Sequence, residues 1–203
     1  MTEQTPEHPR LTKGERTRQR IIDAAFELFS RSGYRAVSLR DIAAHAGLTH
    51  AGVLHHFPSK EATLIDVLTR RDQVDAPLVL DPGLDSAELI ENLVGIIERN
   101  SRIPGLVSLY AKLSAEATDP DHPANFYFTR RYEILRERLT SAFAILLADR
   151  PGVSPETAAV QLLALLDGLQ VQWLLAPESV DMRASALDYL RLLGVAVEET
   201  DDT

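Results

Sequence analysis

The stretch SLRDIAAHAGLTHAGVLHHFPSK, residues 38–60, decides the fold of this chain. It predicts a pair of short helices joined by a tight turn. Ser38 and Asp41 form a capping box, in which each side chain bonds a backbone amide beside the other, and this box opens a helix to about Ala46. Gly47 then breaks the helix.

The second helix begins after Thr49, which is a good N-capping residue. It must end near Phe57, because Pro58 disfavours helical geometry in the residue before it. Ala43 is small where a bulky side chain would push the helices apart, and Val53 supplies an apolar side chain for the angle between them. This pattern is typical of a helix-turn-helix unit, whose second helix enters the DNA major groove.

The histidines of the second helix could form a metal site, a catalytic site or a DNA-binding surface. Val53 and Phe57 lie one turn apart and face the core, so His50, His55 and His56 occupy the rest of the circumference. His50 and His55 are five residues apart, unlike the i, i+4 pair that places two metal ligands on one helix face. No nucleophile–base pair is near them. We therefore expect no metal site and no catalytic site, and interpret the histidines as DNA contacts.

Basic residues around this unit favour DNA contact over an ordinary solvated surface. Arg40 lies in the first turn of the first helix. Lys60 lies in the first turn of the next helix, where free amides and the positive helix end attract a phosphate. We interpret Arg10, Lys13, Arg16, Arg18 and Arg20 as a basic arm ahead of the first long helix. The predicted DNA-binding residues are Arg16, Ser38, Arg40, Thr49, His50, Gly52, Leu54, His55 and Lys60.

The charge of the chain is unevenly distributed. The net charge is −9, but residues 1–60 hold nine Lys/Arg and six Asp/Glu, a balance of +3, and residues 61–203 hold twelve and twenty-four, a balance of −12. A basic front on an acidic body is common where only the front meets a polyanion, although chance can produce so modest an excess.

The composition indicates a soluble protein of the cytoplasm. Hydrophobic residues make up 45% of the chain and charged residues 25%, an ordinary globular composition. The absence of cysteine excludes disulfides, thiolate zinc sites and cysteine nucleophiles. No apolar run reaches the roughly 18 residues of a membrane span, so we expect no membrane contact. Residues 1–12 are polar and contain prolines, which indicates a disordered arm, and residues 199–203 form an acidic tail.

Helical periodicity continues through the rest of the chain and strand signals are nearly absent. We therefore predict an all-α fold of about nine helices. Prolines and a glycine at Pro77, Pro82 and Gly83 predict a linker loop over residues 73–85. The predicted helices cover residues 16–32, 39–46, 49–57, 59–72, 86–102, 105–117, 124–148, 155–175 and 181–197.

The stretch TRQRIIDAAFELFSRSGYRAVSLRDIAAHAGLTHAGVLHHFPSKEATLIDVL, residues 17–68, resembles the DNA-binding domain of the TetR family of bacterial transcriptional regulators. The segments AAFELFSRSGY, SLRDIAAHAGL and HHFPSKE carry the resemblance. From about residue 75 the chain is similar to the family only in its all-helical architecture. The segment LLALLDGLQVQWLLAPESVDM, residues 162–182, resembles the choline-responsive, BetI-like branch.

The resemblance implies a ligand-responsive regulator. It implies a three-helix DNA-binding domain over residues 13–58, a connecting helix over 59–72 and a ligand-binding and dimerisation domain over 73–198. We expect a repressor that binds a palindromic operator in double-stranded DNA as a homodimer and is released by a small molecule, with no cofactor and no enzymatic activity. The alternatives are a protein-binding adaptor that no longer reads DNA and an all-α enzyme.

Leu54 departs from the family pattern. The family usually has a tyrosine at this position, and that tyrosine commonly bonds a backbone phosphate, which a leucine side chain cannot do. Leu54 either packs on a thymine methyl group or adds little to binding.

The segment 155–175 is apolar nearly all round, which is typical of a helix buried on all sides. In the family, the last two helices pair with their symmetry mates as a four-helix bundle; the alternative is that this helix is the core of the monomer. Gly168 costs roughly 1 kcal/mol relative to alanine in a helix, and a close helix crossing would explain it. The predicted dimer contacts are Leu162, Leu166, Leu169, Trp173, Leu187, Leu190 and Leu193.

The resemblance also implies a small-molecule pocket among the middle helices. The candidates are the aromatic residues Tyr110, Phe126, Tyr127 and Trp173 and the polar residues Glu116, Arg131, Asp167 and Gln170. For each of them, core packing or a surface role is an equal alternative. The acidic body and the BetI-like segment favour a cationic or neutral ligand. Asp119, Asp121 and His122 could form a weak metal site, but a proline-rich turn is the preferred interpretation.

Overall fold

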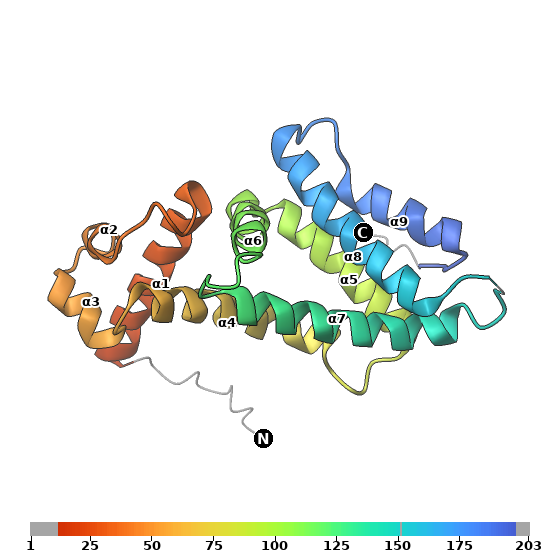
Figure 1. Ribbon diagram of the computed structural model, residues 1–203, viewed down its shortest axis with the longest axis horizontal. Helices are drawn as coiled ribbons and strands as arrows, with labels where there is room; N and C mark the ends of the chain where they lie inside the picture. Colours follow the sequence, from red (N-terminus) through yellow and green to blue (C-terminus); the bar gives the residue numbers. More distant parts are fainter. Residues whose placement is uncertain (1–11, 151, 198–203) are drawn as a thin grey trace, which may run out of the picture.

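The computed structural model describes residues 12–150 and 152–197, which form nine α-helices and no β-strand (Figure 1). The all-α prediction is therefore confirmed over the described chain. The helices are α1 (Lys13–Ser32), α2 (Leu39–His45), α3 (His50–His56), α4 (Lys60–Val79), α5 (Ser86–Ser101), α6 (Pro104–Glu116), α7 (Asn125–Leu146), α8 (Pro155–Leu175) and α9 (Met182–Leu193).

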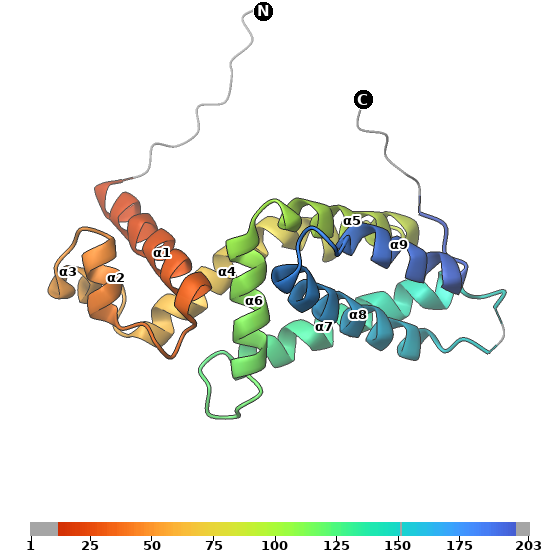
Figure 2. The same ribbon diagram turned by 90° about the horizontal axis from the view of Figure 1, so that it is seen from above.

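The nine helices are arranged as a small head and a larger body joined by one long helix. Helices α1, α2 and α3 gather at one end of the molecule, and α5, α7, α8 and α9 form the other end (Figure 1). Helix α4 begins in the head and continues along the body. Figure 2 shows α6 standing between α1 and the body helices, and both α4 and α6 pack against α1.

Two apolar cores follow from this arrangement. The first core lies in the head but includes Leu109 and Leu113 of α6 and Phe128 of α7. The second core lies in the body between α5, α7, α8 and α9. Because α6 and the start of α7 contribute to the head core, head and body share continuous packing.

The predicted capping residues are confirmed. The hydroxyl of Ser38 accepts a hydrogen bond from the amide of Asp41, and the Asp41 carboxylate accepts one from the Ser38 amide. The side chains of Thr49, Ser59 and Ser154 each accept a hydrogen bond from the amide three residues later. These bonds satisfy amides that a helix N-terminus otherwise leaves free.

The first helix starts earlier than predicted. Thr12 and Glu15 form a complete capping box, so α1 begins at Lys13 rather than at Arg16. The prediction of a basic arm is therefore wrong for Lys13, Arg16, Arg18 and Arg20, which lie inside α1. Arg10 lies outside the described residues, together with the rest of residues 1–11 of the predicted disordered arm and the acidic tail over residues 199–203.

The predicted linker over 73–85 is wrong in its first half, because α4 continues to Val79. Pro77 lies in the last turn of α4. A proline has no amide donor, so it removes one helical hydrogen bond, but little of the helix remains beyond this position to be disturbed. Asp75 is buried and forms ion pairs with Arg71 of α4 and Arg99 of α5. These ion pairs and the buried Val79 extend the connecting helix along the body.

The last helix ends earlier than predicted, at Leu193 rather than at residue 197. Gly194 adopts a left-handed conformation with φ of 81°, and the amide of Val195 bonds the carbonyl of Leu190. This is the usual way in which a glycine ends a helix.

Helix α8 has two different apolar faces. One face packs against α6, α7 and α9 and buries Leu162, Leu166 and Leu169. Among the described residues, α8 is the one helix long and apolar enough to cross a membrane by length and composition, although Gln161 and Asp167 interrupt its apolar run. The burial of one face inside the body fits a core helix of a globular protein equally well.

Candidate nucleic-acid interface and cavities

The helix-turn-helix is held by small and apolar residues at the predicted positions. Ala43, Val53 and Phe57 are buried, and the Leu48 amide bonds the Ala43 carbonyl at 2.8 Å. Gly47 has a φ of 64°, a left-handed conformation that glycine adopts without steric cost. Helix α3 is thereby fixed across α2 with one side buried and the other in solvent.

The outer side of α3 presents a compact set of polar and apolar groups. Thr49, His50, Leu54 and His55 are exposed, and Gly52 is half-buried. A neutral imidazole both donates and accepts hydrogen bonds, so each histidine can pair with a base edge or a phosphate oxygen. Leu54 is 41% exposed and is an apolar side chain among these polar groups.

Some of the other predicted DNA contacts are exposed to solvent, and others are hydrogen-bonded within the head. Arg16 and Arg40 are exposed on the head. The Ser38 hydroxyl, in contrast, is used within the cap of α2, where it also donates to Asp41 at 2.6 Å. Ser38 therefore positions α2 and has less capacity for a phosphate than predicted.

Lys60 is placed differently from the phosphate contact that the sequence predicts. Its Nζ donates to the carbonyl oxygens of Tyr34 at 3.0 Å and Val37 at 2.9 Å. The same ammonium lies 4.1 Å from the centre of the Tyr34 ring. Its charge is thus bound to the α1–α2 loop, and Lys60 joins that loop to the start of α4.

Two arginines of α1 also hold the head together. Arg18 forms a bidentate ion pair with Asp66 of α4 and lies 4.6 Å from the centre of the Phe57 ring. Arg20 donates to the carbonyl of Ala46, next to the glycine turn. These contacts position α3 relative to α1 and α4.

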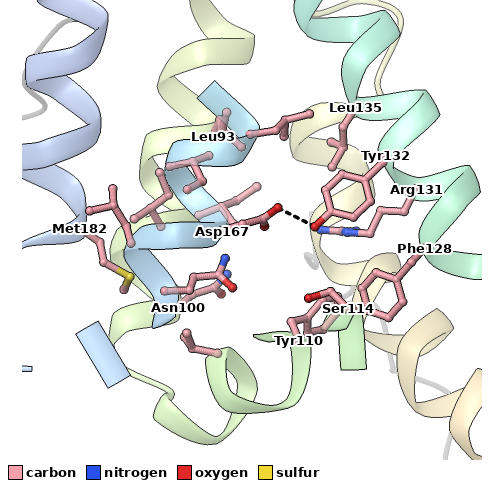
Figure 3. A pocket seen from close by; sticks show the side chains of 17 residues that line it. Leu93, Asn100, Tyr110, Ser114, Phe128, Arg131, Tyr132, Leu135, Asp167 and Met182 are labelled. Carbon is pink, nitrogen blue, oxygen red and sulfur yellow. Dashed lines mark hydrogen bonds between the residues drawn. The ribbon is translucent and has the colours of Figure 1, made fainter. Parts of the chain in front are cut away.

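An inner cavity of about 110 Å³ lies between α5, α6, α7, α8 and α9 (Figure 3). Four of the predicted ligand residues line it, namely Tyr110, Arg131, Asp167 and Gln170. Asn100, Ser114 and Tyr132 are further polar lining residues, which the sequence does not predict because helical periodicity alone does not align residues of different helices.

Carboxylates meet tyrosines around the inner cavity. The Tyr132 hydroxyl donates to Asp167 at 2.6 Å across the cavity (Figure 3). Burial raises the pKa of Asp167, and the Tyr132 hydrogen bond and the Arg131 charge oppose that rise. Burial likewise raises the pKa of Tyr110 to about 12. The hydroxyl groups of Tyr110 and Tyr132 therefore stay protonated at neutral pH and can donate hydrogen bonds.

An outer cavity of about 530 Å³ lies mainly between α4, α5 and α7. Its lining is largely aliphatic and includes three predicted ligand residues, Phe126, Tyr127 and Arg131. Phe126 is 81% exposed at the rim. Leu93, Ile96, Arg131 and Leu135 line both cavities and so form a common wall.

Asp72 belongs to α4, the connecting helix, and is bonded to Arg131 of this wall. Its carboxylate accepts hydrogen bonds from Arg131 at 2.6 Å, from the Tyr127 hydroxyl at 2.5 Å and from the Tyr110 hydroxyl at 3.4 Å. Arg131 also lies 5.2 Å from the centre of the Tyr110 ring. One residue of α4 is thereby bound to side chains of α6 and α7 that border the cavities.

The remaining ligand candidates lie elsewhere. Trp173 borders a different surface hollow, beside the loop between α8 and α9. Glu116 lies near the head, with a carboxylate oxygen 3.5 Å from Nε2 of His122. Neither borders the inner or the outer cavity. Within the described residues, no three His, Cys, Asp or Glu side chains are grouped as a metal site.

The predicted dimer contacts are wrong for five of the seven residues. Leu162, Leu166, Leu187 and Leu190 are buried in the body core of the single chain, and Leu169 is buried as well. These five side chains are therefore not available to a partner, and Trp173 and Leu193 are half-buried. An apolar stripe lies instead on the opposite side of α8, at one-turn spacing. The stripe, called here the α8 outer face, consists of Val160, Ala164, Gly168, Val171 and Leu175.

Two family profiles match this chain. The profile described as "Bacterial regulatory proteins, tetR family" matches residues 21–67. The profile described as "BetI-type transcriptional repressor, C-terminal" matches residues 112–194. The first match covers the head and the start of α4, and the second covers the body from α6 to the end of α9.

Similar proteins include several transcriptional regulators. The chain is 27% identical over 194 residues to the regulator AcrR of Shigella flexneri, and the match covers 89% of each chain. The crystal structure of NalD, the secondary repressor of the MexAB-OprM multidrug efflux pump in Pseudomonas aeruginosa, is 25% identical with a TM-score of 0.71 over 90% of this chain and 96% of that chain. SmeT of Stenotrophomonas maltophilia in complex with triclosan shares the fold, at 22% identity and a TM-score of 0.72 over 88% of this chain and 90% of that chain.

Proposed function

This chain belongs to the TetR family of bacterial transcriptional regulators, and from that premise we propose that it is a ligand-responsive repressor. It binds a palindromic operator as a homodimer and releases it when a small molecule occupies the body. The AcrR relative and the NalD repressor support this reading. As a regulator it acts in the cytoplasm and catalyses no reaction.

The single observation that carries the proposal is the outer side of α3. His50, His55 and Leu54 project into solvent from a helix whose other side is fixed by Val53 and Phe57. In a helix-turn-helix the second helix enters the major groove, and its exposed side chains read the base edges. His50 and His55 are thus assigned to DNA reading.

The α8 outer face supports a homodimer. Val171 is 48% exposed and Leu175 is 81% exposed on the single chain. Contiguous exposed apolar side chains favour association, and Gly168 leaves room for close approach of a second helix. A two-fold dimer places two α3 helices in successive major grooves, about one turn of DNA apart.

Release follows if the ligand binds more tightly to a dimer whose two heads are wrongly spaced. A ligand changes DNA affinity only by its differential affinity for the two arrangements. Asp72 of α4 lines the outer cavity and bonds Tyr110 and Arg131, which line the inner one, and α4 begins in the head. This connection supports transmission from the body to α3.

The decisive experiment is selection of binding sites from random duplex DNA, followed by affinity measurements with wild type and His55→Ala. We expect a palindrome, with specificity relaxed at one symmetric base pair in the variant. Affinity should fall steeply with salt, because phosphate contacts release counterions. Failure to select any sequence, with no DNA affinity at low salt, would favour a protein-binding adaptor instead.

A further inference from the structure

The two cavities of the body differ in a way that assigns them different roles. Small-molecule sites in proteins usually have volumes of about 300–1,000 Å³. The outer cavity, at about 530 Å³, lies in that range, and the inner cavity, at about 110 Å³, does not. The outer cavity can therefore hold a ligand, whereas the inner cavity has room for a side-chain head group.

The charges of the outer cavity are already paired. Asp72 pairs with Arg131, Asp75 with Arg99, and Arg130 with Glu133 at 3.2 Å. The other lining residues are aliphatic or aromatic, among them Ile65, Val79, Leu80 and Ile134. A charged ligand would have to compete with these pairs, so the cavity suits a neutral, apolar molecule.

Arg131 lies between two carboxylates. It pairs with Asp72 of α4 at 2.6 Å, on the side of the outer cavity. On the other side, Arg131 and Asp167 of α8 both extend into the inner cavity, next to the Tyr132 hydroxyl (Figure 3). Within the part of the chain that the structure describes, Asp167 accepts the Tyr132 hydrogen bond and forms no ion pair.

We propose that Arg131 is a two-position switch, which pairs with Asp72 in the DNA-binding state and with Asp167 when a neutral apolar molecule fills the outer cavity. The proposal rests on the ligand-responsive function inferred above. Movement of the guanidinium into the inner cavity takes its charge away from the ligand and gives it a second carboxylate.

The Asp72 carboxylate remains satisfied during this exchange. It keeps the hydrogen bonds from Tyr127 and Tyr110, which makes the switch reversible. It loses its ionic partner, however, and with it the ion pair between α4 and α7. Because the first turn of α4 is bound to the α1–α2 loop through Lys60, a displaced α4 moves the head.

The test uses the full chain and the neutral, apolar fluorescent probe N-phenyl-1-naphthylamine. Probe affinity is measured by fluorescence titration without DNA for wild type, Asp72→Asn and Asp167→Asn. Asp72→Asn weakens the resting partner of Arg131 and should tighten probe binding several-fold. Asp167→Asn removes the second partner and should weaken it about tenfold, a typical size for a coupling between sites.

Opposite signs from the same chemical change distinguish a switch from a general loss of charge or stability. Asp149→Asn, an exposed carboxylate in the loop after α7, is the matched control and should leave probe affinity unchanged. Ala76→Trp fills the outer cavity from α4 and should abolish probe binding. Thermal unfolding of each variant verifies that it folds.

Several results would overturn the proposal. These are no saturable probe binding by wild type, shifts of the same sign in Asp72→Asn and Asp167→Asn, or full probe binding by Ala76→Trp. A second measurement, operator affinity with saturating probe, should fall about tenfold for wild type and less than twofold for Asp167→Asn. If the protein binds no DNA, the proposed function fails, but the probe titrations still decide whether Arg131 switches.

Discussion

Lys60 binds Tyr34 in two ways, because its ammonium donates to the Tyr34 carbonyl oxygen and also lies over the Tyr34 ring. The next residue, Glu61, accepts a hydrogen bond from the Tyr34 hydroxyl at 2.8 Å. The first turn of α4 therefore holds both ends of one tyrosine in the α1–α2 loop. This contact joins the connecting helix to the helix-turn-helix.

We expect Lys60→Met to reduce the free energy of unfolding by about 2 kcal/mol, the usual worth of hydrogen bonds to a charged group. The methionine keeps the apolar stem but leaves the carbonyl oxygens of Tyr34 and Val37 without a donor. Urea unfolding at neutral pH measures the loss. The dependence of DNA affinity on salt should keep its slope, because the ammonium contacts no phosphate.

Arg40→Gln is the contrasting variant. Arg40 is exposed on α2, so its replacement should leave unfolding unchanged. If each protomer of the bound homodimer contacts one phosphate through Arg40, the slope of log affinity against log salt concentration should become smaller by about 1.8, which is about 0.9 for each of the two phosphates. An unchanged stability in Lys60→Met together with a smaller salt slope would restore the phosphate role for Lys60.

The difference between these two residues illustrates what the sequence could predict. The caps at Ser38, Thr49 and Ser59 and the packing of Val53 depend on neighbours a few residues away, and the local pattern predicted them correctly. The partners of Lys60 lie 23 and 26 residues away along the chain. No local sequence pattern shows these partners, so the position of Lys60 at a helix N-terminus led to the prediction of a phosphate contact.

The sequence could not predict the α8 outer face, the proposed dimer surface, for another physical reason. Helix α8 is apolar nearly all round, so it lacks the polar face that would mark its solvent side. Packing against α6, α7 and α9 decides that Leu162 and Leu166 turn inward and that Val171 remains outside. The Asp72–Arg131 pair likewise joins helices distant in sequence.

We expect Val171→Glu to dissociate the homodimer. The substitution places a carboxylate on each α8 outer face, where the interface would bury it without a partner at a cost of several kcal/mol. Sedimentation equilibrium should therefore give a monomer at concentrations where wild type is dimeric. Val74→Glu on α4 is the control, because Val74 is 52% exposed and Val171 is 48% exposed; a dimer in both variants would contradict the assignment.

Gly168→Ala tests the same face with a smaller change. An alanine Cβ at this position meets no atom of the described chain within 4 Å. Alanine should stabilise the isolated helix by roughly 1 kcal/mol. We expect the dimer dissociation constant to rise nonetheless, because the added methyl separates two closely crossing helices. A tighter dimer would mean that no close crossing occurs at Gly168.

Asp167→Asn should raise the free energy of unfolding at pH 7. Burial raises the pKa of Asp167 above its ordinary value of 3.8, so the folded chain holds a proton there more strongly than the unfolded chain. Ionisation at neutral pH therefore lowers stability, and this loss disappears as pH falls through the folded-state pKa to below the unfolded value. Urea unfolding should give a more stable variant at pH 7 and no difference well below pH 3.8; equal stabilities at both pH values would show that Asp167 is well solvated.

Leu54→Ala and Leu54→Tyr decide the role of the apolar residue on the reading side of α3. Leu54 is large and exposed where DNA would cover it, so we expect it to pack on a thymine methyl group, a contact that distinguishes base pairs. Leu54→Ala should then lower affinity for the selected operator about fivefold, as loss of roughly 1 kcal/mol implies, and leave affinity for random DNA unchanged. Leu54→Tyr should alter preference at one symmetric base pair. A gain in affinity for all sequences in Leu54→Tyr would instead indicate a phosphate contact that this chain has lost, and competition binding with operator and random duplexes measures both outcomes.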